Sequence, residues 1–280
     1  MFFPDPHIID PLDTTKHTNT LILLHGRGSN GPEFAEELFS SKTSCGLSLA
    51  QVLPSYRWVF PTSKSYYNET FQEEMNEWFD IASLTDPDLE REGQLKGLRE
   101  SLRFLRRVVR GEIEILGGDC RRVVLGGMSQ GMAAGLWTLF ALAGDGFSGV
   151  DGRIGGFLGT CGWLPFAKDV GGLEGDEKGR GALGFFLEKL SDGSEEMRNS
   201  EVDTAVLSTP MLLLHGSDDA WVDVELGRQA KRVLEGTIGM SVQWLEFTGA
   251  ENDGHWIKEI EGFDRILRFL EQIEAFAGTW

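Results

Sequence analysis

One serine in this sequence stands between two glycines at the junction of two apolar segments. The stretch "VVLGGMSQGMAAGLW", Val123 to Trp137, carries Ser129 in a Gly-x-Ser-x-Gly pattern. The pattern alone is weak, because a structural turn would use the same residues. With a strand-like run before it and a helix-like run after it, it predicts a strained turn that lifts the hydroxyl above the sheet edge, at a helix start whose dipole favours negative charge. We therefore interpret Ser129 as a nucleophile.

A serine hydroxyl needs a base to accept its proton, and histidine is the usual base. Of the five histidines, His255 lies in the polar loop "GAENDGHW", before the last predicted helix. His25 and His215 each end an apolar strand in the setting "LLHG", where a local hydrogen bond is the simpler role. His7 and His17 precede the predicted sheet. We interpret His255 as the base, while a structural loop or capping histidine would fit the same position.

The base in turn needs a carboxylate that orients it. The segment "HGSDDAWVD" follows a predicted strand and offers Asp218, Asp219 and Asp223. A serine, then an aspartate, then a histidine is the chain order that hydrolases built on a parallel sheet use. Spacing alone does not separate Asp218 from Asp219.

Attack of a serine on a carbonyl group creates an oxyanion, which needs preorganised N–H donors. One donor would be the backbone N–H of Gln130, the residue after the nucleophile. The other would come from the loop "HGRGSNG", where Arg27 offers its N–H and Gly26 and Gly28 let the backbone approach the substrate. A simple glycine turn is the alternative for this loop.

The elements that would position these residues alternate between strands and helices. Continuous apolar runs, typical of strands buried on both faces, predict strands at residues 20–26, 56–62, 121–127, 154–162, 210–216 and 242–248. Apolar residues three and four apart predict helices near residues 95–109 and 260–273. The pattern favours one α/β domain over residues 1–280, with a mostly parallel central sheet covered by helices on both faces.

An acidic, glycine-rich segment at about residues 166–208 interrupts this pattern. It contains "KDVGGLEGDEKGRGALG" and the short amphipathic piece "ALGFFLEKL". Such a composition favours a mobile surface insertion. A lid over the pocket, with Phe185 and Phe186 as its apolar face, is the alternative.

Composition excludes several classes of partner and site. The formal charge of −18 would repel nucleic acids and anionic lipid headgroups. Three scattered cysteines favour neither a zinc site nor a disulfide framework, so we expect no metal and no cofactor. The N-terminus lacks the features of a signal peptide, and no stretch reaches transmembrane length, so we expect a cytoplasmic protein without membrane insertion.

Five segments together resemble the acyl-protein thioesterase family, the phospholipase/carboxylesterase group of small α/β-hydrolases, and its fungal members above all. They are "LILLHGRGSNG", "NEWFDI", "GGMSQGMAAGLW", "GTCGWLP" and "HGSDDAWV". The resemblance runs from about Thr20 to the last helix, apart from the insertion. It implies the α/β-hydrolase fold, a Ser129, Asp219, His255 triad and an oxyanion N–H from Arg27. It also implies metal-independent hydrolysis of fatty acyl esters and thioesters, with a lipidated protein as one candidate substrate.

The sequence departs from the family pattern at four positions near these motifs. Met132 replaces a second glycine, Ser29 an aspartate, Cys161 a serine and Asp223 a proline. None of these changes removes a chemical group of the triad. A thiol nucleophile at Cys161 is an alternative, but a small buried apolar residue is the simpler role.

The substrate is left open by the sequence. Aromatic residues that would line an acyl channel, or else pack against the core, are Tyr66, Tyr67, Phe71, Trp78 and Trp163. A lysophospholipase and a small-molecule carboxylesterase would use the same machinery. A ligand-binding relative without turnover would have no use for the complete triad. The oligomeric state is not predicted.

Overall fold

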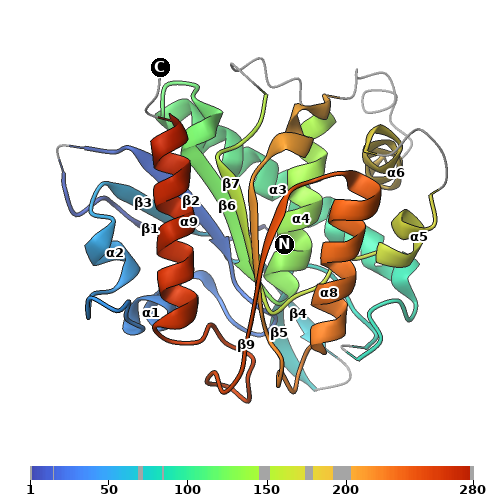
Figure 1. The fold of residues 1–280 in the computed structure, drawn as a ribbon. Helices are drawn as coiled ribbons and strands as arrows, with labels where there is room; N and C mark the ends of the chain where they lie inside the picture. Colours follow the sequence, from blue (N-terminus) through green and yellow to red (C-terminus); the bar gives the residue numbers. More distant parts are fainter. Residues whose placement is uncertain are drawn as a thin grey trace.

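The computed structural model describes residues 2–14, 16–68, 72–83, 85–144, 152–173, 179–191 and 203–277. Within these residues seven strands form one sheet in the order β1-β3-β2-β6-β7-β8-β9 (Figure 1). Only β1 runs antiparallel to its neighbour; the other pairs are parallel. The strands are β1 (His7–Ile9), β2 (Asn19–Leu24), β3 (Tyr56–Phe60), β6 (Val123–Met128), β7 (Gly156–Thr160), β8 (Met211–Gly216) and β9 (Val242–Phe247).

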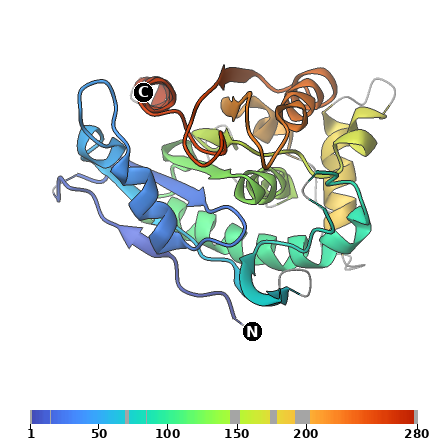
Figure 2. The same ribbon diagram turned by 90° about the horizontal axis from the view of Figure 1, so that it is seen from below.

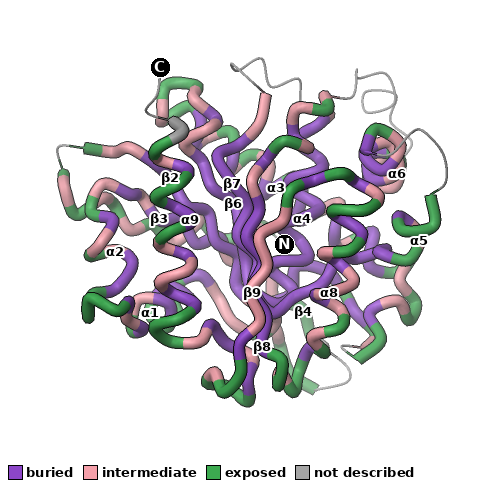
Figure 3. The backbone as a smooth tube through the Cα atoms, in the orientation of Figure 1, coloured by how far each residue is buried: buried purple, intermediate pink, exposed green. Residues whose placement is uncertain are grey.

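The central strands are buried along their whole length. Every residue of β2, β6, β7 and β8 is buried, which accounts for their continuous apolar sequences. Figure 3 shows these strands as a buried layer between helices whose outer sides are exposed. The predicted parallel sheet is therefore confirmed, with strand ends that differ by one or two residues from those expected.

Helices cover both faces of the sheet. The main ones are α1 (Gly31–Ser40), α3 (Gln94–Ile115), α4 (Gln130–Ala141), α6 (Arg180–Leu190), α8 (Val224–Val233) and α9 (Glu261–Ala277). Among the described residues, the apolar side chains of α3, α4, α6 and α8 form one cluster, and those of α1 and α9 form another. Figure 2 shows α9 and α3 on opposite sides of the strands.

Shorter elements connect these layers. They are α2 (Leu49–Val52), α5 (Ala167–Gly171), the 3₁₀ helices η1 (Arg91–Gly93), η2 (Cys120–Arg122), η3 (Leu142–Gly144) and η4 (Thr204–Ser208), and the π-helical turn η5 (Leu234–Ile238). None of the helices in the described ranges is both long and apolar enough to cross a membrane.

A β-hairpin forms in a segment for which the sequence predicted neither a strand nor a helix. Strands β4 (Lys64–Asn68) and β5 (Glu73–Glu77) pair antiparallel, with Lys64 opposite Glu77. The hairpin was missed because neither strand has an apolar face: the pair carries "KSYYN" and "EEMNE". Phe71, one of the proposed substrate contacts, lies outside the described residues.

The described part of the insertion packs into the core. Helix α6 lies on α4, and Phe186 is fully buried. Its ring stacks on Phe140 with 4.4 Å between ring centroids and meets the edge of Trp137 at 5.1 Å. The expectation of a mobile surface segment is therefore wrong for α6. Residues 174–178 and 192–202 of the insertion lie outside the described ranges.

The parallel strands all end at one edge of the sheet, the lower edge in Figure 1. The loops that follow β2, β6, β8 and β9 carry the candidate residues of the oxyanion loop, the nucleophile, the acid and the base, in that order. Because ligands of open α/β sheets bind at the carboxyl ends of the strands, this edge is where a site is expected.

Candidate active site

Ser129 occupies a strained turn between β6 and α4. Its φ of 54° and ψ of −122° lie outside the regions that residues with a side chain favour. The backbone N–H of Ser129 donates to the carbonyl of Thr160 at 2.8 Å, which ties the turn to the end of β7. A Cβ atom at Gly127 would lie 2.5 Å from the carbonyl carbon of Gly131, and one at Gly131 would overlap the carbonyl oxygen of Leu24. Both glycines are therefore required by close approach, as the pattern predicted.

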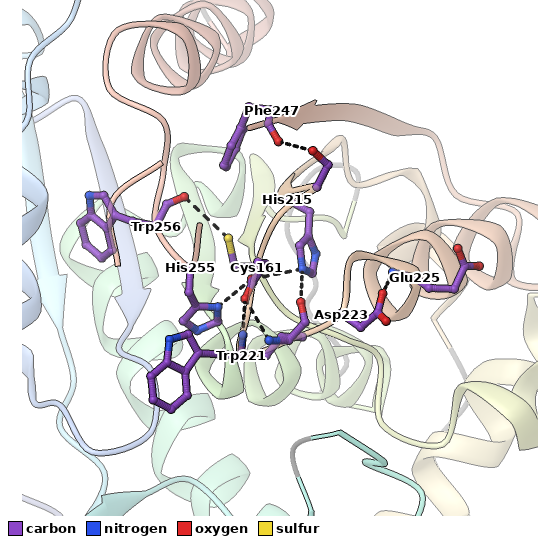
Figure 4. A network of polar contacts seen from close by, with 11 residues as sticks. Cys161, His215, Trp221, Asp223, Glu225, Phe247, His255 and Trp256 are labelled. Carbon is purple, nitrogen blue, oxygen red and sulfur yellow. Dashed lines mark hydrogen bonds and ion pairs between the residues drawn. The ribbon is translucent and has the colours of Figure 1, made fainter. Parts of the chain in front are cut away.

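His255 is oriented by Asp219. Its Nδ1 donates to Oδ2 of Asp219 at 2.7 Å. The neighbouring carboxylates have other partners: Asp218 accepts the N–H of Gly249 at 2.8 Å, and Asp223 caps α8 by accepting the N–H of Glu225 at 2.8 Å. The structure thus pairs Asp219 with the histidine, a choice that spacing alone left open. His255, His215 and the backbone of Trp221 all contact Asp219, and Figure 4 shows these three residues in one network of polar contacts.

The Asp219 carboxylate is held by donors on both oxygens. Oδ1 accepts the N–H groups of Trp221 and Val222, both at 2.9 Å. Nε2 of the buried His215 lies 3.4 Å from Oδ2 and donates to the carbonyl of Val222 at 2.9 Å. Burial alone would raise the pKa of Asp219, but the hydrogen bonds from His215 and His255 outweigh it and hold the pKa well below its usual range. The side chain is therefore an anion at every ordinary pH.

The contact of His215 with Asp219 was missed by the sequence argument. We expected His215 to make a local hydrogen bond, and the bond to Val222 is one. The four-residue separation between His215 and Asp219 was the available signal, but it does not show that the loop folds back on the strand end.

Ser129 and His255 both line a pocket of about 520 Å³. Its apolar lining comes from Phe34, Met75, Met128, Trp221 and Trp256. Three carboxylates, Glu37, Glu73 and Asp253, also line it. No described residue of the insertion borders this pocket, so the proposed lid with Phe185 and Phe186 is not in place over it.

The two residues proposed for the oxyanion hole flank the serine. Gln130 opens α4 directly after Ser129, and Arg27 lines the pocket. A Cβ atom at Gly26 would lie 3.5 Å from Cβ of Ser129, so the loop after β2 passes close beside the nucleophile. Gly28 has a φ of +84°, a conformation that favours glycine.

Four of the proposed substrate contacts are corrected by the structure. Trp78 and Trp163 are buried in the core, where the ring of Trp163 meets the edge of Phe79. Tyr66 and Tyr67 are exposed on β4. None of the four lines the pocket that holds Ser129 and His255. The substrate contact is therefore wrong for these four residues, and the alternative of core packing holds for Trp78 and Trp163. The sequence does not reveal which way an aromatic side chain near a motif points.

Cys161 is buried next to Asp219 and His255 and does not line the pocket. Burial raises the pKa of its thiol, which removes the thiolate that a nucleophile needs. Its Sγ donates to the carbonyl of Trp256 at 3.8 Å. Ligand atoms of Cys161, Asp219 and His255 lie within 4.8 Å of one another, but the latter two already hydrogen-bond to each other. The expected role of a small buried residue fits this position.

With this geometry in place, the comparisons with known proteins assign the family. A profile of the family described as phospholipase/carboxylesterase matches residues 5–172. The chain belongs to the phospholipase/carboxylesterase family.

Two similar relatives are fungal proteins named acyl-protein thioesterase 1. The protein of Gibberella zeae is 25% identical over 265 residues, which cover 94% of this chain and 90% of the relative. That of Yarrowia lipolytica is 25% identical over 260 residues, 92% of either chain.

A solved structure shares the fold. The acyl-protein thioesterase 2 of Zea mays matches with a TM-score of 0.64 and 21% identity, covering 96% of this chain and 98% of its own. The expected α/β-hydrolase fold and the expected class of serine ester hydrolase are thereby confirmed for this phospholipase/carboxylesterase family member.

Proposed function

We propose that this protein hydrolyses acyl esters and thioesters with Ser129 as the nucleophile, His255 as the general base and Asp219 as the orienting acid. One observation carries the proposal: His255 is hydrogen-bonded to a buried carboxylate and faces the pocket that holds a serine in a strained turn. This is the combination that activates a serine.

The proposed reaction begins with proton transfer. Because Nδ1 of His255 donates to Asp219, Nε2 is the nitrogen that accepts the proton of the Ser129 hydroxyl. The Ser129 oxygen then bonds to the carbonyl carbon, and the carbonyl oxygen becomes an anion that accepts the N–H groups of Arg27 and Gln130. Collapse of this intermediate breaks the bond to the leaving group, which takes the proton from His255. Water then hydrolyses the acyl-enzyme by the same steps.

Asp219 supports the positive charge that forms on His255. Since hydrogen bonds keep its pKa far below neutrality, it is charged before the proton moves. The carboxylate therefore stabilises the imidazolium without itself being protonated.

The pocket lining favours a hydrocarbon acyl chain and a leaving group without negative charge. Phe34, Met128 and Trp256 offer apolar contact to hydrocarbon. Glu37 and Glu73 would repel a phosphate placed at the same opening. This favours an acylated protein, as in the names of the fungal relatives, over a lysophospholipid.

A ligand-binding protein without turnover is the second candidate. The strained conformation of Ser129 argues against it, because such a backbone costs about 1–3 kcal/mol and persists where function requires it. A binding pocket would gain nothing from that cost.

A hydrolysis panel tests the proposal. We expect the purified protein to hydrolyse S-acyl peptides and neutral acyl esters and to hydrolyse lysophospholipids more slowly. Ser129→Ala should abolish all three activities. Faster hydrolysis of lysophospholipids would overturn the substrate assignment. A protein that binds acyl chains but cleaves none of these substrates would be the ligand-binding relative.

A further inference from the structure

Residues 76–79, "NEWF", contact both segments that carry the candidate oxyanion donors. We call these four residues the clamp segment. They comprise the last two residues of β5 and the two residues that follow. On one side lies the loop after β2, which includes Arg27, and on the other lies the start of α4, where Gln130 stands.

The backbone of the loop after β2 is tied to Asn76. The N–H of Gly28 donates to the carbonyl of Asn76 at 2.9 Å, and the Asn76 amide donates back to the carbonyl of Ser29 at 3.0 Å. These two bonds bracket Gly28, the position with a left-handed backbone. They therefore fix the peptide groups immediately after Arg27.

The side chain of Arg27 is tied to Glu77 by a buried ion pair. Nε of Arg27 donates to Oε2 of Glu77 at 3.0 Å, and the two side chains are only 11% and 5% exposed. A charged hydrogen bond shielded from water is strong and directional, and loss of one partner leaves a buried charge that must rearrange. Glu77 thereby restrains the residue whose backbone N–H is the first donor.

The clamp segment also hydrogen-bonds to the side chain of Gln130, the second donor residue. Oε1 of the fully buried Gln130 accepts the N–H of Trp78 at 2.9 Å, and its amide nitrogen donates to the carbonyl of Phe79 at 2.7 Å. The indole N–H of Trp78 donates to the carbonyl of His25 at 2.8 Å. One short segment thus bonds to both strand ends.

The clamp segment is itself held by the hairpin and by α3. Glu77 stands opposite Lys64 in the register of the hairpin, and the Ser101 hydroxyl donates to the carbonyl of Trp78. A Cβ atom at Gly97 would lie 2.7 Å from Cα of Phe79, so α3 lies directly against the segment. Movement of the segment would require displacement of a helix.

We propose that the clamp segment sets the spacing of the two oxyanion N–H donors and that Glu77 is a positioning residue of the reaction. The proposal rests on the hydrolase function proposed above. Oxyanion donors act only when they lie about 2.7–3.1 Å from the position that the anion will occupy, and a displacement of about 1 Å can cost 100-fold in rate. Glu77 touches no reacting atom and acts through Arg27.

The test compares four forms of the full chain: wild type, Glu77→Gln, the double variant Arg27→Met with Glu77→Met, and Asp119→Asn. The last is the matched control. Asp119 forms a half-buried ion pair with Arg121 before β6, at the opposite end of that strand from Ser129. For each form, kcat and KM are measured with one neutral acyl ester. The inhibition constant of an alkyl trifluoromethyl ketone, which forms a tetrahedral oxyanion adduct with a serine, is measured as well. Thermal unfolding reports stability.

In Glu77→Gln we expect kcat to fall about 10- to 100-fold, KM to change less than threefold, and the inhibition constant of the ketone to rise in proportion. The double variant removes both charges together, so its stability should recover towards wild type while kcat stays low. Asp119→Asn should lower stability and leave kcat within twofold of wild type.

Four results would overturn the proposal. A wild-type kcat in Glu77→Gln, or recovery of kcat together with stability in the double variant, would show a structural role only. A rise in KM at constant kcat would place Glu77 in ground-state binding. A wild-type protein without ester hydrolysis would overturn the proposed function as well, which distinguishes the two failures.

Discussion

At the residue scale, the candidate acid is distinguished from its neighbour by its partners rather than by its type. Asp218 and Asp219 are adjacent carboxylates, yet one binds a loop N–H and the other binds His255. The family spacing pointed to Asp219, but periodicity and composition could not, because both residues leave the same strand end. The contact depends on how the loop after β8 turns, and that turn is set by the N–H groups of Trp221 and Val222.

The exchange of each carboxyl group for an amide tests this assignment. Asp219→Asn removes the charge that stabilises the imidazolium and reverses the hydrogen-bonding preference of His255, so kcat should fall about 10⁴-fold. Asp218→Asn, the matched control, should stay within a few-fold of wild type. Steady-state ester hydrolysis measures both. Equal losses in the two variants would contradict the pairing of Asp219 with His255.

One contribution to the pH dependence of stability comes from His25, which is buried beside the oxyanion loop. Nδ1 donates to the carbonyl of Gly26 at 2.6 Å, and Nε2 accepts the N–H of Ser63 at 3.0 Å, so the ring is held neutral. Burial lowers the pKa of His25 to about 4 from its ordinary 6.5. Between these values the unfolded chain binds the extra proton and the folded chain does not, so stability decreases as pH falls.

We expect the free energy of unfolding to fall by about 3 kcal/mol between pH 6.5 and pH 4 from this histidine. Its contribution should be constant above pH 6.5. Urea unfolding of wild type and His25→Gln at a series of pH values measures the difference. The variant should be less stable at pH 7 but should show a shallower loss towards pH 4; parallel curves would refute this origin of the pH dependence.

At the element scale, α6 shows where sequence patterns succeeded and where they failed. The long strands were predicted because their apolar runs are continuous. Helix α6 was assigned to a surface insertion because glycine and acidic residues around it dominate the composition, while the informative feature was the apolar pair Phe185 and Phe186. Strand β1 has only three residues, and the hairpin has no apolar alternation, so neither produced a pattern.

Truncation of the buried ring tests the structural role of α6. Phe186→Ala should destabilise the protein by about 3–5 kcal/mol, because the ring fills the space between Phe140 and Trp137. Phe185→Ala, at the adjacent half-buried position, should cost much less. Denaturant unfolding measures both. In folded Phe186→Ala the ratio of long-chain to short-chain ester hydrolysis should match that of the wild type. A changed ratio would indicate that α6 acts as a lid over the pocket.

At the scale of the whole molecule, the acidic charge and the carboxylates of the pocket act in the same direction. The chain carries a formal charge of −18, and Glu37, Glu73 and Asp253 line the pocket. The charge could be read from composition, whereas the position of these three carboxylates around the candidate serine required the fold. Together they should attract cationic leaving groups and repel anionic ones.

The dependence of the rate on salt concentration separates long-range electrostatic attraction from direct contact between the leaving group and the pocket. For esters that differ only in a charged leaving group, kcat/KM should be higher for the cationic ester at low salt. The difference should shrink as ionic strength rises from about 0.01 M to about 1 M, because the Debye length falls from roughly 30 Å to 3 Å. A neutral ester serves as the control. Preference for the anionic ester would contradict the proposed role of Glu37, Glu73 and Asp253.

Covalent labelling tests whether Ser129 is an activated nucleophile. The protein is incubated with an alkyl fluorophosphonate, and the modified residue is mapped by mass spectrometry of peptides. We expect one stoichiometric adduct on Ser129 in the wild-type protein and none in Ser129→Ala. The adduct should form much more slowly in His255→Ala, which keeps the serine but lacks its base. A folded wild-type protein that is not labelled, or a label that persists on another residue in Ser129→Ala, would contradict the account.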